Sequence, residues 1–328
     1  MIRRLVVLAD GLRDDPAAAI ADCVWIDLDR PLAVELAEVE ATLDLRLPPP
    51  DRGPRVETSD QFYRRGRAIY LHFGLLASLG GPVPTTVPLL LVVTPHCLVT
   101  VRWADTPAIP DPFASMLAHA AGDTRQPTRD TLLADLLETL IERFSAQLGT
   151  AELDLEAIAA RLFDEEARPA SRKLFDRARA FRTLLRKIGR RDHTVARMRI
   201  HLVGLGRGVA YLLAQPEAQV ALECRHTLTV LAADIRDLTE LSLGISQQTA
   251  FLQDAALGQI NIDQNVVMKL FTIVSVLFLP PTLIGTIYGM NFEAMPELAT
   301  SFGYPLTLVA MILSAAAPLW WFRRRGWF

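Results

Sequence analysis

The sequence predicts an α+β membrane protein with an N-terminal cytosolic α/β domain, long stalk helices and two C-terminal transmembrane helices. Its 328 residues suffice for two or three structural units of ~100–200 residues each. Hydrophobic residues make up 51% of the chain although 22% of it is charged, so the apolar residues must be concentrated in one part. Two uncharged stretches near the C-terminus hold that concentration. The net charge of −3 gives no basic footprint, so no nucleic-acid partner is expected.

Residues 1–126 are predicted to form the cytosolic α/β domain. Segment 31–45 has helical spacing and begins with a proline, whereas 107–112 is a breaker that a short helix follows. The three cysteines of the chain are far apart and fit no zinc or redox spacing, which favours a reducing compartment. Apolar or β-branched runs bounded by Gly and Pro predict strands. These runs are 5–9, 23–28, 68–76 and 87–101.

Residues 127–268 are predicted to be long cytosolic helices that include the stalk. Leucines recur at helical intervals after Thr128 and Asp130, which are helix start signals. No proline occurs between Pro216 and Pro280. A helix over 217–290 would have ~74 residues and a length of ~110 Å, whereas the mean globular helix has ~11–12 residues. We therefore expect a stalk that continues into the first membrane span.

Basic side chains crowd residues 172–199. They indicate a surface for anionic lipid or nucleic acid, a repulsive gate for cations, or a solvated helix face. The solvated face, paired with acidic neighbours such as those at 164–166, is the favoured interpretation. The glycine-rich run 204–208 follows no predicted strand and lacks the Walker pattern, so it is not expected to be a phosphate loop.

Residues 269–328 are predicted to form a transmembrane hairpin with a basic cytosolic tail. The segments 270–291 and 298–322 contain no charged residue. About 20 residues of α-helix cross a hydrocarbon core of ~30 Å, and Trp320 and Trp321 would anchor the second span at the interface. Both segments are therefore predicted to span the membrane.

Charge predicts the orientation of this hairpin. The connection 292–304 carries Glu293 and Glu297 but no Lys or Arg, whereas Lys269 and the arginines at 323–325 lie outside the pair. Because Lys and Arg stay on the cytoplasmic side, both termini are expected to be cytoplasmic and the short acidic loop external.

A stripe of residues at alternating spacings of three and four follows the predicted stalk and first span. A mean step of ~3.5 residues keeps one side of a helix toward a common axis. Inside the span this side carries small hydroxyl residues, which fits either close helix packing or the lining of a water-filled path. One chain cannot enclose such a path, but a cyclic ring of identical first helices could. The stripe is Asp254, Leu257, Asn261, Asn265, Met268, Thr272, Ser275, Leu279, Thr282 and Thr286.

The outer end of the first predicted span carries a specific string of residues. Tyr-Gly-Met-Asn at 288–291 closes the span, and Met-Pro-Glu-Leu follows at 295–298. The combination resembles the signature of the CorA family of divalent-metal (magnesium/cobalt) transporters, in which Gly-Met-Asn closes the first of two C-terminal helices. The similarity is strong over 257–328, and elsewhere only the layout of an α/β part followed by long helices is similar.

The resemblance implies a homopentameric funnel whose first membrane helix lines the pore, which favours pore lining over close packing for the stripe. Gly289, Met290 and Asn291 would form the external selectivity filter, and Asn291 would contact the hydrated metal ion. Glu293 and Glu297 would raise the cation concentration at the outer mouth. The pore-lining residues of the stripe would then be Asn265, Met268, Thr272, Ser275, Leu279, Thr282 and Thr286, of which Asn265, Met268, Leu279 and Thr282 match the family's pore-lining positions.

The implied function is channel-like uptake of Mg²⁺, and of Co²⁺ or Ni²⁺, across the cell (inner) membrane. No nucleotide-binding motif is present, so the membrane potential would drive transport. Intracellular Mg²⁺ would gate it, with Asp254 as the one plausible match to the family's regulatory metal site. Mg²⁺ is then both the transported and the regulatory ion, and no other cofactor is implied. The implied partners are further copies of the chain, divalent cations and the lipid bilayer.

Three other interpretations compete with this one. A proton-coupled Zn²⁺ transporter of the related ZntB branch shares the architecture, but no histidine follows His226 to offer an imidazole ligand in the pore. A membrane-anchored signalling protein would not need the polar stripe or the acidic loop. An enzyme is not expected, because the sequence presents no catalytic Ser/His/Asp or Cys/His arrangement.

Overall fold

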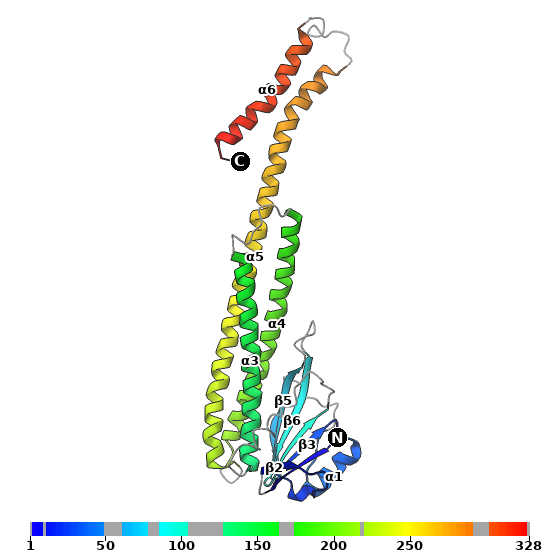
Figure 1. Cartoon of the computed structure of the whole chain (residues 1–328), viewed down its shortest axis with the longest axis vertical. Coiled ribbons are helices and arrows are strands. Elements are labelled where there is room, and N and C mark those ends of the chain that lie inside the picture. The colour runs from blue at the N-terminus through cyan, green and yellow to red at the C-terminus, as the bar shows by residue number, and fades with distance from the viewer. Residues whose placement is uncertain are drawn as a thin grey trace. The chain divides into compact units, whose positions relative to one another are not determined.

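The computed structural model consists of two compact units. The first comprises Met1–Pro169 and Arg182–Gln253, and the second comprises Ala170–Phe181 and Asp254–Phe328. Figure 1 shows the chain coloured by residue number, with most of its helices and strands labelled. The structure describes residues 2–8, 11–48, 61–77, 85–103, 127–163, 174–216, 220–290 and 302–326.

The described part of the first unit contains a seven-stranded sheet in the order β2-β1-β3-β7-β6-β5-β4. β3 and β7 pair in parallel, with Trp25 opposite Leu98. The other neighbouring strands pair antiparallel, so the sheet is mixed, as the predicted α/β domain requires. The strands are β1 (Ile2–Leu8), β2 (Gly11–Asp14), β3 (Trp25–Asp29), β4 (Phe62–Arg65), β5 (Ala68–Ala77), β6 (Thr85–Val93) and β7 (Leu98–Arg102).

The strand predictions over 5–9, 23–28 and 68–76 are confirmed by β1, β3 and β5. The single run over 87–101 is wrong, because two antiparallel strands, β6 and β7, divide it. Thr94 makes the turn between them: its N–H donates to the Cys97 carbonyl (3.0 Å), and its hydroxyl oxygen accepts the Cys97 N–H (2.9 Å). Strands β2 and β4 were not predicted from the sequence, because they are four-residue edge strands with little apolar pattern.

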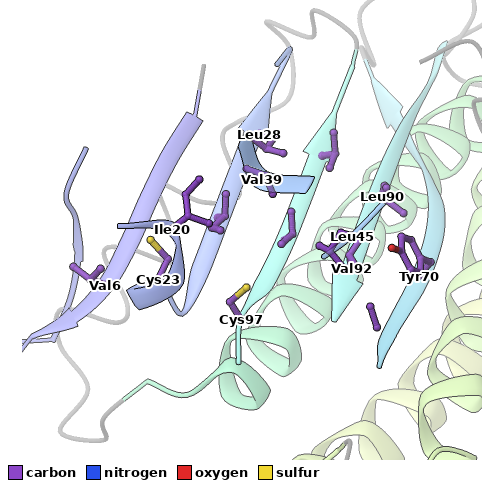
Figure 2. Packing of buried hydrophobic residues seen from close by; sticks show 14 residues of the cluster. Val6, Ile20, Cys23, Leu28, Val39, Leu45, Tyr70, Leu90, Val92 and Cys97 are labelled. Carbon is purple, nitrogen blue, oxygen red and sulfur yellow. The ribbon is translucent and has the colours of Figure 1, made fainter. Parts of the chain in front are cut away.

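One face of the sheet packs against α1 (Ala33–Leu43) and a short 3-10 helix, η1 (Ile20–Asp22). Figure 2 shows the buried cluster between them, which includes Val39 of α1 and Leu28, Leu90 and Val92 of the strands. The predicted helix over 31–45 is confirmed with shorter bounds, because the backbone of Asp44 turns left-handed (φ 50°) after its last turn.

The other face of the sheet carries a buried polar chain. The hydroxyl of Thr100 accepts a hydrogen bond from the Trp25 indole (3.1 Å) and donates one to Asp27 (2.7 Å). Asp27 is fully buried, and Arg102 pairs with its second oxygen (2.7 Å). Because every member has a partner, the burial of this charge is compatible with a stable core.

Three long helices, α3 (Arg129–Phe163), α4 (Leu174–Leu213) and α5 (Leu222–Tyr288), follow the sheet in the chain. In the first unit they run alongside one another next to the sheet (Figure 1). Thr128 caps α3 as predicted, since its hydroxyl oxygen accepts the Thr131 N–H (3.2 Å). The predicted stalk helix is confirmed, with 67 residues in α5.

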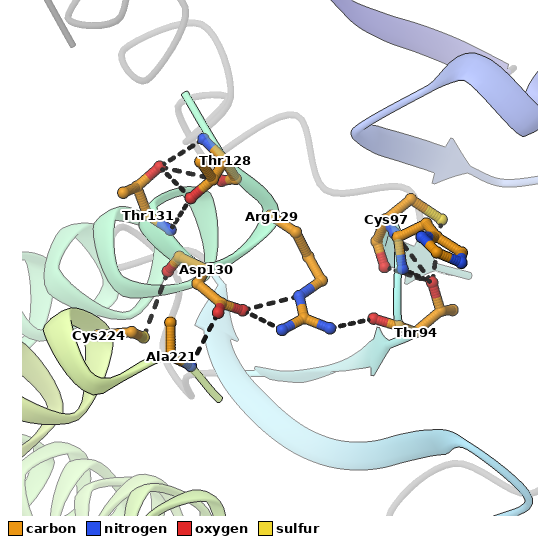
Figure 3. Close-up of polar contacts among 9 residues, drawn as sticks. Thr94, Cys97, Thr128, Arg129, Asp130, Thr131, Ala221 and Cys224 are labelled. Atoms are coloured by element: carbon orange, nitrogen blue, oxygen red, sulfur yellow. Dashed lines mark hydrogen bonds and ion pairs between the residues drawn. The ribbon is translucent and has the colours of Figure 1, made fainter. Parts of the chain in front are cut away.

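Asp130 connects the start of α3 to the start of α5 (Figure 3). Its carboxylate accepts a hydrogen bond from the backbone N–H of Ala221 (2.9 Å) and pairs with Arg129. Arg129 also donates to the Thr94 carbonyl in the β6–β7 turn (2.5 Å), and the Cys224 thiol donates to the Asp130 carbonyl (3.3 Å). The sequence marks Asp130 only as a helix start signal, whereas the structure makes it the junction of three elements.

Close packing explains the glycine run at 204–208, which lies inside α4. A Cβ on Gly208 would lie 2.6 Å from the Phe73 ring of β5, and one on Gly206 would lie 3.2 Å from Ile235 of α5. These glycines therefore let α4 approach the sheet and the neighbouring helix closely. The basic segment of α4 is partly paired, because Arg191 forms an ion pair with Asp154 of α3.

The second unit contains the remainder of α5 and α6 (Gly303–Arg324). Both helices are long and apolar enough to cross a membrane, and only 6% of the most apolar window of each is buried. A core helix of a globular domain would be mostly buried, so this exposure favours two membrane spans. The predicted break after Pro107 and the acidic neighbours at 164–166 lie outside the described residues.

Candidate functional site

The predicted pore-lining stripe lies on one side of α5. At 3.6 residues per turn its members within the span fall inside an arc of about 100°. All of them are exposed, including the two large apolar ones, Met268 (64%) and Leu279 (70%). The exposed stripe comprises Asn265, Met268, Thr272, Ser275, Leu279, Thr282 and Thr286.

The opposite side of α5 is less exposed and contacts α6. Ile273 is buried, and Leu277 and Ile284 are half-buried. A Cβ on Gly285 would lie 3.0 Å from the terminal methyl of Met311 on α6. α6 therefore covers one side of the first span at Gly285 and leaves the stripe uncovered.

The threonines of the stripe bond to their own helix. The hydroxyl of Thr272 donates to the Met268 carbonyl (2.9 Å), that of Thr282 to the Phe278 carbonyl (2.7 Å), and that of Thr286 to the Thr282 carbonyl (2.7 Å). Each hydroxyl hydrogen is thus used within the helix, whereas the oxygen keeps lone pairs for a further donor. The stripe therefore presents hydrogen-bond acceptors, which suit the water shell of a cation.

Two consecutive prolines, Pro280 and Pro281, lie inside α5 without ending it. A proline has no N–H, so the carbonyls of Val276 and Leu277 lose their usual helical donors. All four residues are half-buried. They lie toward the less exposed side of the helix. Within a membrane, missing helical hydrogen bonds are tolerated where neighbouring helices pack against the helix.

The described part of the predicted filter begins where α5 ends. Gly289 follows the last helical residue, and its N–H donates to the Gly285 carbonyl (3.0 Å). The Met290 N–H donates to the Ile287 carbonyl (3.3 Å), and the Met290 side chain is 45% exposed. The other predicted residues of the filter and mouth, Asn291, Glu293 and Glu297, lie outside the described residues.

The predicted regulatory residue Asp254 is exposed on α5. Within the described residues of this single chain, no group of three or more His, Cys, Asp or Glu side chains could hold a metal ion. Asp254 by itself offers one carboxylate, so metal binding there requires ligands from another copy of the chain or from water.

Sequence reasoning missed Gly285 as the contact with α6, although a signal was present. Gly285 and Gly289 are four residues apart, which is the spacing of small residues that brings membrane helices together. The basic end of α6 is also organised: Arg324 lies 5.3 Å from the Trp320 ring centroid, and Arg325 lies 4.9 Å from that of Trp321. Such aromatic and basic pairs fit the boundary between membrane and water.

An α/β domain, long helices and an exposed pair of membrane-length helices define a two-span membrane protein with a large extramembrane part. The chain belongs to a family described as "CorA-like Mg2+ transporter protein", whose model matches residues 21–324. The magnesium transport protein CorA of Haemophilus ducreyi is 31% identical over 99% of this chain and 96% of its own length.

Solved structures show the same fold. The CorA magnesium transporter of Methanocaldococcus jannaschii matches 100% of this chain and 99% of its own, with a TM-score of 0.78 and 19% identity. The ZntB cytoplasmic domain of Vibrio parahaemolyticus matches 79% of this chain and 97% of its own, with a TM-score of 0.56 and 12% identity. The predicted fold class and the family resemblance are therefore confirmed.

Proposed function

We propose that this protein is a channel-like transporter that takes up Mg²⁺ across the cytoplasmic (inner) membrane, with Co²⁺ and Ni²⁺ as secondary cargo. The observation that carries the proposal is the uncovered stripe of α5, with its hydroxyl and amide oxygens on one side of a membrane-length helix. Membership of the CorA-like family and the similarity to magnesium transport proteins support the choice of ion. The activity is transport and not enzymatic catalysis.

The proposed assembly is a homopentamer. One chain with two spans cannot enclose a path, and polar side chains facing lipid are unfavourable. A closed ring of α5 helices would bring the stripes together around a central axis and leave α6 toward lipid. Lys269 and the arginines at 323–325 support cytoplasmic termini, because basic residues stay on that side.

The proposed path handles Mg²⁺ with its water shell in place. Mg²⁺ dehydrates reluctantly, so amide oxygens of an Asn291 ring would bond the shell without displacing it. Glu293 and Glu297 would concentrate cations at the outer mouth. Further along the path from the outer mouth, the threonine oxygens would accept hydrogen bonds from the water shell. Rings of Met268 and Leu279 would close the path by dewetting.

The proposed driving force is the membrane potential. The sequence contains no nucleotide-binding motif. A divalent cation gains roughly 4.6 kcal/mol per 100 mV on entering a negative interior, twice the value for one charge. Intracellular Mg²⁺ would restrain entry: Asp254 carboxylates gathered around the axis repel one another, and Mg²⁺ bound between subunits would favour the closed ring.

Ion uptake into proteoliposomes tests the proposed function. We expect Mg²⁺ uptake driven by potential alone, a pentameric mass in detergent, and loss of selective uptake in Asn291→Ala without loss of assembly. The control Gln247→Ala, at an exposed site in the first unit, should transport like the wild type. Uptake of Zn²⁺ that requires a pH gradient, with none of Mg²⁺, would show instead a ZntB-like transporter.

Limited proteolysis tests the proposed gating by intracellular Mg²⁺. Millimolar Mg²⁺ should slow digestion of the extramembrane part of the wild type and protect Asp254→Ala less. Equal digestion of the wild type with and without Mg²⁺ would contradict this gating mechanism and leave the transport proposal standing.

A further inference from the structure

A cavity of about 270 Å³ lies in the first unit between strands β5 and β6 and helix α4. The stripe on α5 does not contribute to it. The polar side chains that line it are Gln61, His72, Thr86, Arg199, His201 and Arg207.

The charged side chains among the described residues of this lining are both basic. Arg199 is half-buried and Arg207 is exposed, and both line the cavity. No carboxylate is among the residues that line it in the described part of the chain. A divalent cation, which needs oxygen ligands of negative charge, is therefore a poor occupant, and an anion is a good one.

Both histidines of the cavity are more than nine-tenths buried, with 9% of His72 and 7% of His201 exposed. His201 forms a hydrogen bond with the Thr86 hydroxyl (3.2 Å). The His72 ring stacks on Tyr63, with 6.0 Å between ring centroids, and has no hydrogen-bond partner within the described part of the chain. The ring nitrogens of His72 are not among the buried polar atoms that lack a partner, so they are open to the cavity, where a ligand oxygen would accept a hydrogen bond.

The backbone is adapted to hold His201 in this place. A Cβ on Gly74 of β5 would lie 2.6 Å from Cε1 and 2.7 Å from Nδ1 of the His201 ring. Glycine at this position lets the imidazole lie directly against the strand. Arg207, six residues further along α4, lies over the Phe62 ring (5.9 Å to its centroid), a contact that favours this direction of its guanidinium.

The protonation of these groups fits an anion site. Burial lowers the pKa of His72. Burial and the neighbouring Arg197 lower the pKa of His201 to about 4. Both rings are thus neutral at physiological pH in a positively charged surrounding, and an oxyanion would relieve that charge while accepting hydrogen bonds from arginine and imidazole.

We propose that the cavity between β5, β6 and α4 binds a small doubly charged oxyanion, with Arg199 and Arg207 as its charged ligands and His72 and His201 as neutral hydrogen-bond partners. The ligand chemistry is that of inorganic phosphate or the phosphate group of a small metabolite. The glycine run in α4 takes no part through its amides, because those amides lie inside the helix. The site is therefore distinct in chemistry from a phosphate loop.

The test uses the full-length protein in lipid nanodiscs with EDTA present, so that Mg²⁺ carries no phosphate to the protein. Radiolabelled inorganic phosphate is titrated by equilibrium dialysis, with sulfate and acetate as competitors. We expect saturable binding of one phosphate per chain, competition by sulfate, and weak competition by acetate. A phosphate monoester in place of phosphate distinguishes a metabolite site from one that only admits the free ion.

Arg199→Gln and Arg207→Gln should each weaken phosphate binding about tenfold, since each removes a charged hydrogen-bond donor. Arg190→Gln is the matched control, because Arg190 is exposed on the same helix and does not line the cavity. Arg207 is exposed, so its variant is expected to fold even if Arg199→Gln does not. Absence of saturable binding, or equal weakening by Arg190→Gln, would overturn the proposal.

Discussion

The terminal methyl of Met311 on α6 lies 3.0 Å from the point that a β-carbon on Gly285 of α5 would occupy. One turn further, a β-carbon on Gly289 would lie 3.1 Å from the Gly285 carbonyl oxygen. The two membrane-length helices therefore meet where α5 has no side chain. Their contact leaves the stripe on the other side of α5 free for other copies of the chain or for water.

Enlarging Gly285 should separate the two helices. We expect Gly285→Leu to lower the thermal stability of the assembled protein and to reduce Mg²⁺ uptake, because the new side chain occupies the place of Met311. Gly258→Ala is the control on the same helix, since a Cβ there meets no atom within 4 Å. It should be neutral or stabilising by up to about 1 kcal/mol through helix propensity. Melting curves and Mg²⁺ flux measurements distinguish the two variants. Wild-type stability and flux in Gly285→Leu would contradict a contact between α6 and Gly285.

Removing one stripe hydroxyl should slow transport. Thr282→Val keeps the side-chain shape but deletes the oxygen, so we expect Mg²⁺ uptake to fall about tenfold, which corresponds to ~1.4 kcal/mol. Thr307→Val on α6 is the matched control, because the Thr307 hydroxyl also donates to its own helix, at the Gly303 carbonyl (2.9 Å). Equal flux in the two variants would argue against threonine oxygens in the path.

Making the apolar stripe positions polar should open the path. Met268 and Leu279 are exposed on the stripe, where rings of apolar side chains exclude water. We expect Met268→Ser and Leu279→Ser to raise basal Mg²⁺ flux several-fold. Phe271→Ser, at an exposed position of α5 outside the stripe, serves as the control and should not raise it. Unchanged or reduced flux in both stripe variants would contradict a gate at these residues.

Acid should destabilise the first unit through His201. Its pKa falls from 6.5 to about 4 on folding because of burial and Arg197. The unfolded chain therefore binds the proton first, and stability is lost as the pH falls from about 6.5 toward 4. The loss amounts to ~1.5 kcal/mol between pH 6.5 and 5.

Melting curves in phosphate-free buffer over this pH range measure that loss. His201→Gln should show a shallower decline than the wild type, and His193→Gln, at an exposed site on α4, should decline like the wild type. Identical curves for His201→Gln and the wild type would assign the acid sensitivity to other groups.

The long elements were predictable because their signals are local. Uncharged stretches, helical spacing and the positions of proline suffice to place α3, α5 and α6 within a few residues. The edge strands β2 and β4 were not predictable, since four residues with mixed polarity form a strand only when a neighbour supplies hydrogen bonds. The division of residues 87–101 into two strands depends on the side-chain hydrogen bonds of Thr94, which its residue type alone does not reveal.

The sequence by itself determined the two membrane-length helices, the spacing of the stripe and the family signature at 288–291, because each depends on residues close together in the chain. Only the tertiary structure decided which side of α5 meets α6, that Asp130 bonds to Ala221, and that His72 and His201 share a cavity with Arg199 and Arg207. Met311 lies 26 residues from Gly285, Ala221 lies 91 from Asp130, and His201 lies 129 from His72. Contacts at such separations follow from how whole elements pack, and a local pattern such as the spacing of two glycines does not specify the partner.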